Sequence, residues 1–266
     1  MQRVASLRAP RGGAALLGAA LALAALAAAR PADAQAARAS DTLDLIVAST
    51  TDVHGRLRGW DYFAGRADTV RSLARAATVV DSLRAAHPDR VVLVDAGDLL
   101  QGTPLTYAAA RVAPDQPHPV PAAMNAMRYD AATIGNHEFN YGVETLDRAT
   151  AQARFPFLAA NLRRTDGGRA YRAWTMVERG GAKVAIVGGT TPGSMVWDRD
   201  NLKGKVTIGD IVPAVRAAAA EARAAGADVV VAVLHSGLGE PSARRTLAAR
   251  KGKRACAIAR SSVGTP

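Results

Sequence analysis

The stretch VVLVDAGD, residues 91–98, decides the fold of this chain. The apolar, β-branched run from Val91 to Asp95 predicts a strand that is buried in a sheet. Gly97 follows where the chain must turn sharply, and glycine permits the backbone angles of a tight turn. Asp98 then stands at the carboxyl end of the strand. The stretch therefore predicts a buried strand that presents a carboxylate at one edge of a sheet.

Other apolar runs lead into polar residues in the same way. The predicted strands and the polar residues after them are 43–50 with Asp52 and His54, 129–134 with Gly135-Asn136-His137-Glu138, and 228–234 with His235. Two more strands are expected at 157–160 and 183–188. Ligands of α/β proteins gather at the carboxyl edge of the sheet, so we expect these polar side chains to meet there.

Helical patterns alternate with these strands. Apolar residues at helical spacing lie within 64–86, and further helices are expected at 119–128, from Tyr141-Gly142 onward, and at 211–226. The alternation predicts a layered α/β domain with its site at one sheet edge.

Composition limits the classes of protein that fit. With 266 residues and 49% hydrophobic residues, the chain can form one large domain with a sizeable core. Residues 1–34 combine three early arginines, an Ala/Leu run at 14–28 and the small-residue pattern Ala32-Asp33-Ala34, which predicts a cleaved signal peptide and export to the periplasm. The apolar run is shorter than a membrane span, so we expect no membrane anchor after cleavage. Cys256 is the sole cysteine, which excludes an intrachain disulfide.

The net charge of +11 comes from the two ends of the chain. Residues 241–266 contain seven Lys and Arg and no acid, whereas residues 35–240 contain 23 basic and 22 acidic residues. A nucleic-acid partner is therefore not expected for the folded part. Residues 241–266 show no strand pattern that leads to another ligand.

The polar residues fit a site for two divalent cations. Asp52 and His54 would point the same way from an extended strand and could bind one cation, and the carboxylate of Asp98 could bridge two. The ordinary alternatives are a turn aspartate with a surface histidine, and an aspartate that caps a turn. The residue types do not separate Mn, Zn, Co and Ca.

Asn136 and His137 suggest two different roles, metal binding and proton transfer. Asn136 offers an amide oxygen to a cation, while the imidazole of His137 can meet the substrate and protonate a leaving alkoxide. His235, at the same edge, would be a second-metal ligand. The alternatives are a loop with a hydrogen-bonded amide and a satisfied core histidine. Because no Gly-x-Ser-x-Gly motif occurs, we expect water to be the nucleophile.

Four motifs together resemble the bacterial periplasmic 5′-nucleotidase and 2′,3′-cyclic-nucleotide 2′-phosphodiesterase family. They are TTDVHG at 50–55, VDAGDLLQGTPL at 94–105, IGNHEFNYG at 134–142 and LHSGLG at 234–239. The resemblance implies a calcineurin-like metallophosphoesterase domain, a four-layer αββα sandwich at 40–240, that acts on nucleotides. It implies one cation on Asp52, His54 and Asp98, a second on Asp98, Asn136 and His235, and His137 as the catalytic acid.

Two details favour the 2′,3′-cyclic-nucleotide 2′-phosphodiesterase/3′-nucleotidase branch. In 5′-nucleotidases the residue after Gly-Asn-His-Glu-Phe is often an aspartate that pairs with the catalytic histidine, whereas this chain has Asn140. The segment from Trp197-Asp198 to Gly204-Lys205-Val206 also resembles that branch. A 5′-nucleotidase is the alternative.

The resemblance ends after Gly239 or Glu240. Family members continue with a Gly-His-x-His segment and a base-binding domain, and this sequence has no histidine after His235. We therefore expect 241–266 to reflect a truncation or a change of frame. The rival hypothesis is a non-catalytic fragment with incomplete metal shells. We expect the chain to be a monomer.

Overall fold

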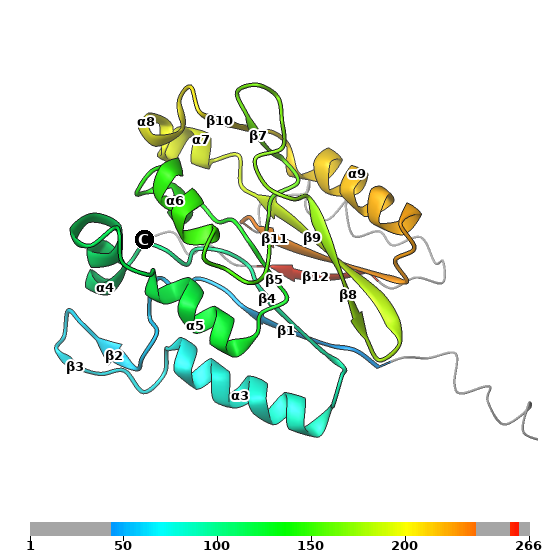
Figure 1. Cartoon of the computed structure of the whole chain (residues 1–266), viewed down its shortest axis with the longest axis horizontal. Helices are drawn as coiled ribbons and strands as arrows, with labels where there is room; N and C mark the ends of the chain where they lie inside the picture. The colour runs from blue at the N-terminus through cyan, green and yellow to red at the C-terminus, as the bar shows by residue number, and fades with distance from the viewer. Residues whose placement is uncertain (1–43, 238–255, 261–266) are drawn as a thin grey trace, which may run out of the picture. The chain divides into compact units, whose positions relative to one another are not determined.

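The computed structural model describes residues 44–237 and 256–260, which all belong to one compact unit, Asp44–Pro266. Figure 1 shows the arrangement of its helices and strands. The predicted signal peptide and the predicted boundary at residue 241 lie outside the described residues. In the part of the chain that is described, no helix has both the length and the apolar character needed to cross a bilayer.

One sheet is entirely parallel and carries most of the predicted site. Its strands are arranged in the order β1 (Ile46–Thr50), β4 (Val91–Asp95), β5 (Ala131–Thr133) and β6 (Phe157–Leu158). Every residue of β4 is buried, as expected for a central strand with apolar residues on both faces. The parallel pairing brings the carboxyl ends of β1, β4 and β5 to the same edge.

The second sheet supplies His235. Its order is β12 (Cys256–Arg260), β11 (Val229–His235), β9 (Ala182–Thr190) and β8 (Trp174–Arg179), and only the β8 pair is antiparallel. The sequence predicted β9 and β11 but neither β8 nor β12. Cys256–Arg260 pairs with β11, within the segment 241–266 where the sequence shows no strand pattern that leads to another ligand.

Three apolar clusters separate four layers, so the predicted αββα sandwich is confirmed. Val92 and Val94 of the first sheet pack with Ile186 and Val231 of the second. The outer face of the first sheet packs against α3 (Leu73–Ala86), α5 (Pro119–Met127) and α6 (Val143–Thr150). The outer face of the second packs against α9 (Ile211–Ala224) through small alanines such as Ala218 and Ala222. Figure 1 shows α3 and α5 on one side of the sheets and α9 on the other.

The helix predicted at 64–86 is shorter than expected. It begins at Leu73, because the Ser72 hydroxyl accepts a hydrogen bond from the backbone N–H of Arg75 and caps the first turn. The residues before it form the hairpin β2 (Trp60–Asp61) and β3 (Arg66–Ala67). Asp61 and Asp68 accept backbone hydrogen bonds two and three residues ahead, which favours turns over helix.

Short elements connect the layers. They are the helix α4 (Pro104–Tyr107), the π-helix η1 (Ala108–Val112), the 3₁₀-helix η2 (His137–Phe139), the strands β7 (Leu162–Arg164) and β10 (Val206–Ile208), and the helices α7 (Ser194–Trp197) and α8 (Arg199–Leu202). β7 and β10 form a separate antiparallel pair.

Candidate metal centre

The two polar residues of the loop after β1 have backbone angles that the sequence did not indicate. Asp52 and His54 were expected in extended backbone, but they lie beyond the end of β1 with φ of 51° and 48°. Their backbone N–H groups donate to the carbonyls of Gly97 and Asp98, at 3.0 and 2.9 Å. These hydrogen bonds tie the loop after β1 to the loop after β4. Both side chains still face the same site.

Asp98 also has left-handed backbone, with φ of 63°. Such a conformation costs a residue other than glycine about 1 to 2 kcal/mol, so the surrounding structure must hold it. Strained backbone of this kind occurs often at functional sites. Among the described residues, three of the five non-glycine residues with such backbone, Asp52, His54 and Asp98, are ligand candidates in the two loops that meet.

Glu138 fixes these loops. Its carboxylate is buried and accepts hydrogen bonds at 2.5 to 3.1 Å from the backbone N–H groups of Asp98, Leu99, Leu100 and Gly135. Burial and the neighbouring charge of Asp98 raise the pKa of Glu138, while the hydrogen bonds oppose this rise. The residue holds the loop after β4 against the loop after β5. This role of Glu138 was not predicted from the sequence, although an acid between the apolar residues Ile134 and Phe139 is a signal for a buried carboxylate.

Two glycines let the loops approach closely. A Cβ on Gly97 would lie 2.6 Å from the backbone nitrogen of Gly135, and a Cβ on Gly135 would lie 2.2 Å from Oδ1 of Asp98. Gly97 also has φ of 97°, which favours glycine. Side chains at these positions would push the ligand candidates apart.

Asp98 lies at the centre of the six candidate residues. Its Oδ1 accepts a hydrogen bond from the backbone N–H of His137, at 2.9 Å. Its Oδ2 lies 3.2 Å from Nε2 of His235 and 3.9 Å from Nε2 of both His54 and His137. Nε2 of His54 is also 3.8 Å from a carboxylate oxygen of Asp52, and Nε2 of His235 is 3.0 Å from Oδ1 of Asn136. The structure thus brings together every residue that the sequence proposed.

The histidine rings are oriented as metal ligands usually are. Nδ1 of His54 faces the carbonyl oxygen of Gln101 at 2.8 Å, and Nδ1 of His235 faces that of Ala96 at 2.8 Å. A carbonyl only accepts, so Nδ1 of each ring carries a hydrogen, and a ring that loses its other proton has its lone pair at Nε2. Both Nε2 atoms point toward Asp98. This donor set of imidazole, carboxylate and amide groups fits divalent cations.

The electrostatics agree with a cation site. Burial lowers the pKa of His235, but hydrogen bonding to Asp98 and the charges of Asp98 and Glu138 outweigh it and raise the pKa to about 9. Burial likewise lowers the pKa of His54, and Asp52, the Gln101 carbonyl and Asp98 together raise it. Negative charge therefore dominates at the centre of the site. A divalent cation would satisfy the same charge that these protons satisfy.

Asp95 stabilises the strand ends that lead to the site. It is fully buried, and burial raises its pKa to about 8 in spite of hydrogen bonds from the Thr50 hydroxyl and the Gly97 N–H. Thr50 and the Tyr129 hydroxyl are 2.7 Å apart. This network links the ends of β1 and β4, so Asp95 has a structural role.

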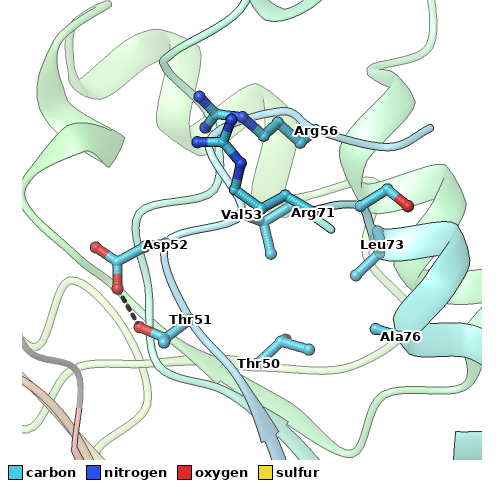
Figure 2. Close-up of a pocket in the computed structure, with 9 residues that line it drawn as sticks. Thr50, Thr51, Asp52, Val53, Arg56, Arg71, Leu73 and Ala76 are labelled. Atoms are coloured by element: carbon cyan, nitrogen blue, oxygen red, sulfur yellow. Dashed lines mark hydrogen bonds between the residues drawn. The ribbon is translucent and has the colours of Figure 1, made fainter. Parts of the chain in front are cut away.

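A cavity of about 210 Å³ borders the site on the side of β1. Its wall includes Asp52, and Val53, Leu73 and Ala76 form its apolar part. Figure 2 shows Arg56 and Arg71 with their guanidinium groups on the same side, and the Asp52 carboxylate against the Thr51 hydroxyl. The two arginines add positive charge to the wall of this cavity.

Comparisons with known proteins agree with this geometry. Residues 46–256 match the family model described as calcineurin-like phosphoesterase. The chain is 36% identical over 215 residues to the trifunctional nucleotide phosphoesterase protein YfkN of Bacillus subtilis. The alignment covers 75% of this chain and 15% of that protein. It is 37% identical over 209 residues to the 2′,3′-cyclic-nucleotide 2′-phosphodiesterase/3′-nucleotidase of Salmonella typhimurium, covering 74% of this chain and 32% of that protein.

A solved structure has the same fold. The calcineurin-like phosphoesterase YfkN from Bacillus subtilis superposes with a TM-score of 0.69 at 35% identity, over 74% of this chain and 63% of that one. The chain spans about a third or less of the length of the curated relatives just named. The ligand and acid roles of the six residues stay predictions. The family expected from the four motifs is confirmed: this chain belongs to the calcineurin-like phosphoesterases.

Proposed function

We propose that the chain hydrolyses nucleotide phosphoesters with divalent cations and water. The observation that supports this most is the convergence of Asp52, His54, Asp98, Asn136, His137 and His235 at one edge of the sandwich. Cations bound there would polarise the phosphoryl group, offset its negative charge and make water more acidic. As in the family motifs, Asp52, His54 and Asp98 would hold one cation, and Asp98, Asn136 and His235 another.

His137 is the residue best placed to protonate the leaving group. Its ring lies edge-on to that of His54, with centroids 4.9 Å apart, and it is the most exposed of the three histidines at the site. Its Nδ1 is directed away from Asp98 toward Oδ1 of Asn140, at 2.6 Å. Nε2, which lies 3.9 Å from Oδ2 of Asp98, is the ring nitrogen that would face a substrate oxygen. A positioned imidazole typically contributes 10²- to 10⁴-fold to such a step.

We further propose the 2′,3′-cyclic-nucleotide 2′-phosphodiesterase/3′-nucleotidase specificity. Asn140 and the Trp197-Asp198 segment support it, and so do three relatives of that name at 36 to 38% identity. A panel of 2′,3′-cyclic AMP, 3′-AMP and 5′-AMP should show preference for the first two. Preference for 5′-AMP would favour the 5′-nucleotidase alternative.

The test of the activity itself needs a matched control. His137→Asn should lose at least 100-fold in kcat on the preferred nucleotide, while His87→Asn, at an exposed helix end, should leave it unchanged. Hydrolysis that persists in His137→Asn, or none in the native chain with Mn, Zn, Co or Ca, would contradict the proposal. Binding of fewer than two cations by calorimetry would favour a non-catalytic fragment.

We propose export to the periplasm as the setting of this activity, supported by the signal-peptide pattern of residues 1–34. Expression of the full chain in a bacterium, fractionation and N-terminal sequencing would test it. A mature protein that begins near Gln35 in the periplasmic fraction is the expected result, and an uncleaved cytoplasmic chain would contradict it.

A further inference from the structure

Asn140 occupies the place where an acidic partner of His137 was considered in the sequence, and it is neutral. Its Oδ1 lies 2.6 Å from Nδ1 of His137. On its other side, Nδ2 donates to Oδ1 of Asp198 at 2.7 Å. The amide thus stands between an imidazole and a carboxylate. A carboxylate is therefore part of this chain of hydrogen bonds, but it contacts Asn140 and not His137.

The side chain of Asp198 does not take the role that its position favours. Asp198 is the N-cap residue of α8, where an aspartate usually accepts a hydrogen bond from the first turn. Here the side chain makes no capping hydrogen bond and turns toward Asn140. It is 7% exposed, and among the residues that the structure describes, its Oδ2 has no hydrogen-bond partner. The hydrogen bond from Asn140 to Oδ1 therefore holds the buried carboxylate of Asp198 in place.

The helix α8 holds residue 140 at a second point. The side-chain amide of Asn201 donates to the backbone carbonyl of Asn140, at 3.3 Å. Backbone and side chain of Asn140 are therefore both held by α8 and its N-cap residue. This segment lies about 60 residues further along the chain, so the contact belongs to the fold and not to the local sequence.

The geometry points to Asp198 as a positioning residue that orients the catalytic histidine through Asn140. An ionised carboxylate only accepts hydrogen bonds, so Asn140 must turn its NH₂ group toward Asp198 and its oxygen toward His137. That oxygen can only accept, so Nδ1 of His137 carries the hydrogen. Nε2 then remains for proton transfer with the substrate. One buried carboxylate sets the amide orientation, the ring tautomer and the ring direction in turn.

This inference deepens the proposed function and rests on it. In the sequence, Asn140 and Trp197-Asp198 were two separate features of one branch. In the structure they are two ends of one hydrogen-bonded chain. An aspartate at position 140 would place a negative charge directly beside His137. Here the charge belongs to Asp198, and the amide of Asn140 links that carboxylate to the ring of His137.

Isosteric substitutions test the inference. Asp198→Asn removes the charge and lets either end of its new amide meet Asn140, so the orientation of Asn140 is no longer set. Asn140→Asp places a second carboxylate beside Asp198, so that one of the two must take up a proton. The double variant N140D/D198N restores one carboxylate and one amide in exchanged order. Asp200→Asn, on the same helix but exposed, is the matched control.

The kinetic readout compares two leaving groups. D198N should lower kcat on 3′-AMP by about tenfold or more, with KM and the number of bound cations unchanged. On p-nitrophenyl phosphate, whose leaving group needs no proton, kcat should fall less than about threefold, because proton donation by His137 matters little there. N140D/D198N should be more active on 3′-AMP than either single variant, and D200N should match the native chain.

A second readout does not depend on activity. Nitrogen-15 spectra of the histidine rings in the metal-free chain, with His137 assigned by its loss in H137N, report which ring nitrogen carries the hydrogen. The native chain should show the hydrogen at Nδ1, and D198N should show a mixture. An unchanged tautomer in D198N would overturn the inference. So would an equal loss on both esters without recovery in the double variant, which would indicate a general structural role.

The two proposals fail in different ways. If the native chain hydrolyses no ester with any cation, the proposed function fails, while the nitrogen-15 comparison still decides the role of Asp198. If the native chain is active and D198N behaves like D200N in both readouts, only the positioning role fails.

Discussion

At the scale of single residues, the site depends on buried groups that never touch a substrate. Glu138 has almost no exposed surface, and four backbone N–H groups converge on its carboxylate. Hydrogen bonds to a charged group contribute more than neutral ones, and an unsatisfied buried donor is costly. The positions of Asp98 and Gly135 therefore follow from one side chain in the Gly-Asn-His-Glu segment.

Glu138→Gln tests this role. The amide turns at least one N–H toward backbone N–H groups that need an acceptor, so we expect a loss of about 2 to 4 kcal/mol in the free energy of unfolding. The affinity for Mn²⁺ should fall about 10- to 100-fold, because the ligand loops lose their support. Urea unfolding and calorimetry measure the two effects. Glu144→Gln, at an exposed acid that pairs with Lys205, is the control, and equal behaviour of the two variants would contradict the role.

At the scale of elements, the start of α5 contains a histidine that the sequence left without a role. Nδ1 of His118 accepts a hydrogen bond from the backbone N–H of Val120 and so caps the helix. Its Nε2 is buried without a hydrogen-bond partner in the described structure. Burial lowers the pKa of His118 to about 4, because the charged ring would lose its solvation.

This pKa makes stability depend on pH. Between pH 6.5 and 4 the unfolded chain binds a proton at this position and the folded chain does not, so folding loses stability as the pH falls. His118→Asn keeps an acceptor at the N-cap but does not titrate. From pH 7.5 to 5, the native chain should lose about 2 kcal/mol more in unfolding free energy than the variant does. Urea unfolding at the two pH values measures this difference, and His87→Asn should behave as the native chain.

At the scale of the whole molecule, the site joins the two sheets. His235 ends β11 of the second sheet, whereas Asp98 and Asn136 follow strands of the first. A cation on these residues would link the layers that otherwise meet through apolar side chains such as Ile186 and Val231. A cation that binds the folded chain but not the unfolded chain should then stabilise the entire sandwich.

Thermal unfolding with and without Mn²⁺ tests the link between the sheets. At a concentration 100 times the dissociation constant, the cation should add about 2.7 kcal/mol to the stability of the native chain. His235→Asn should show a much smaller gain at the same concentration. An equal gain in both proteins would place the bound cation elsewhere.

The sequence indicated the strands that end at the site and the ligand candidates, because buried β-branched runs that end in polar residues are strong local signals. It could not indicate the left-handed backbone of Asp52 and His54, whose N–H groups donate hydrogen bonds to the loop after β4. Nor could it show that Glu138 faces the loop after β4 or that Asp198 faces Asn140. Those contacts join segments about 40 and 60 residues apart, and only the packed layers bring them together.

The most direct test of the account is a titration of the metal-stripped chain with Mn²⁺ while hydrolysis of 2′,3′-cyclic AMP is followed. We expect no turnover without the cation, a rise that saturates at two equivalents per chain, and no rise in Asp98→Asn, because Asp98 is the residue on which the three histidines converge. Turnover that does not respond to Mn²⁺, or an Asp98→Asn variant as active as the native chain, would contradict the account.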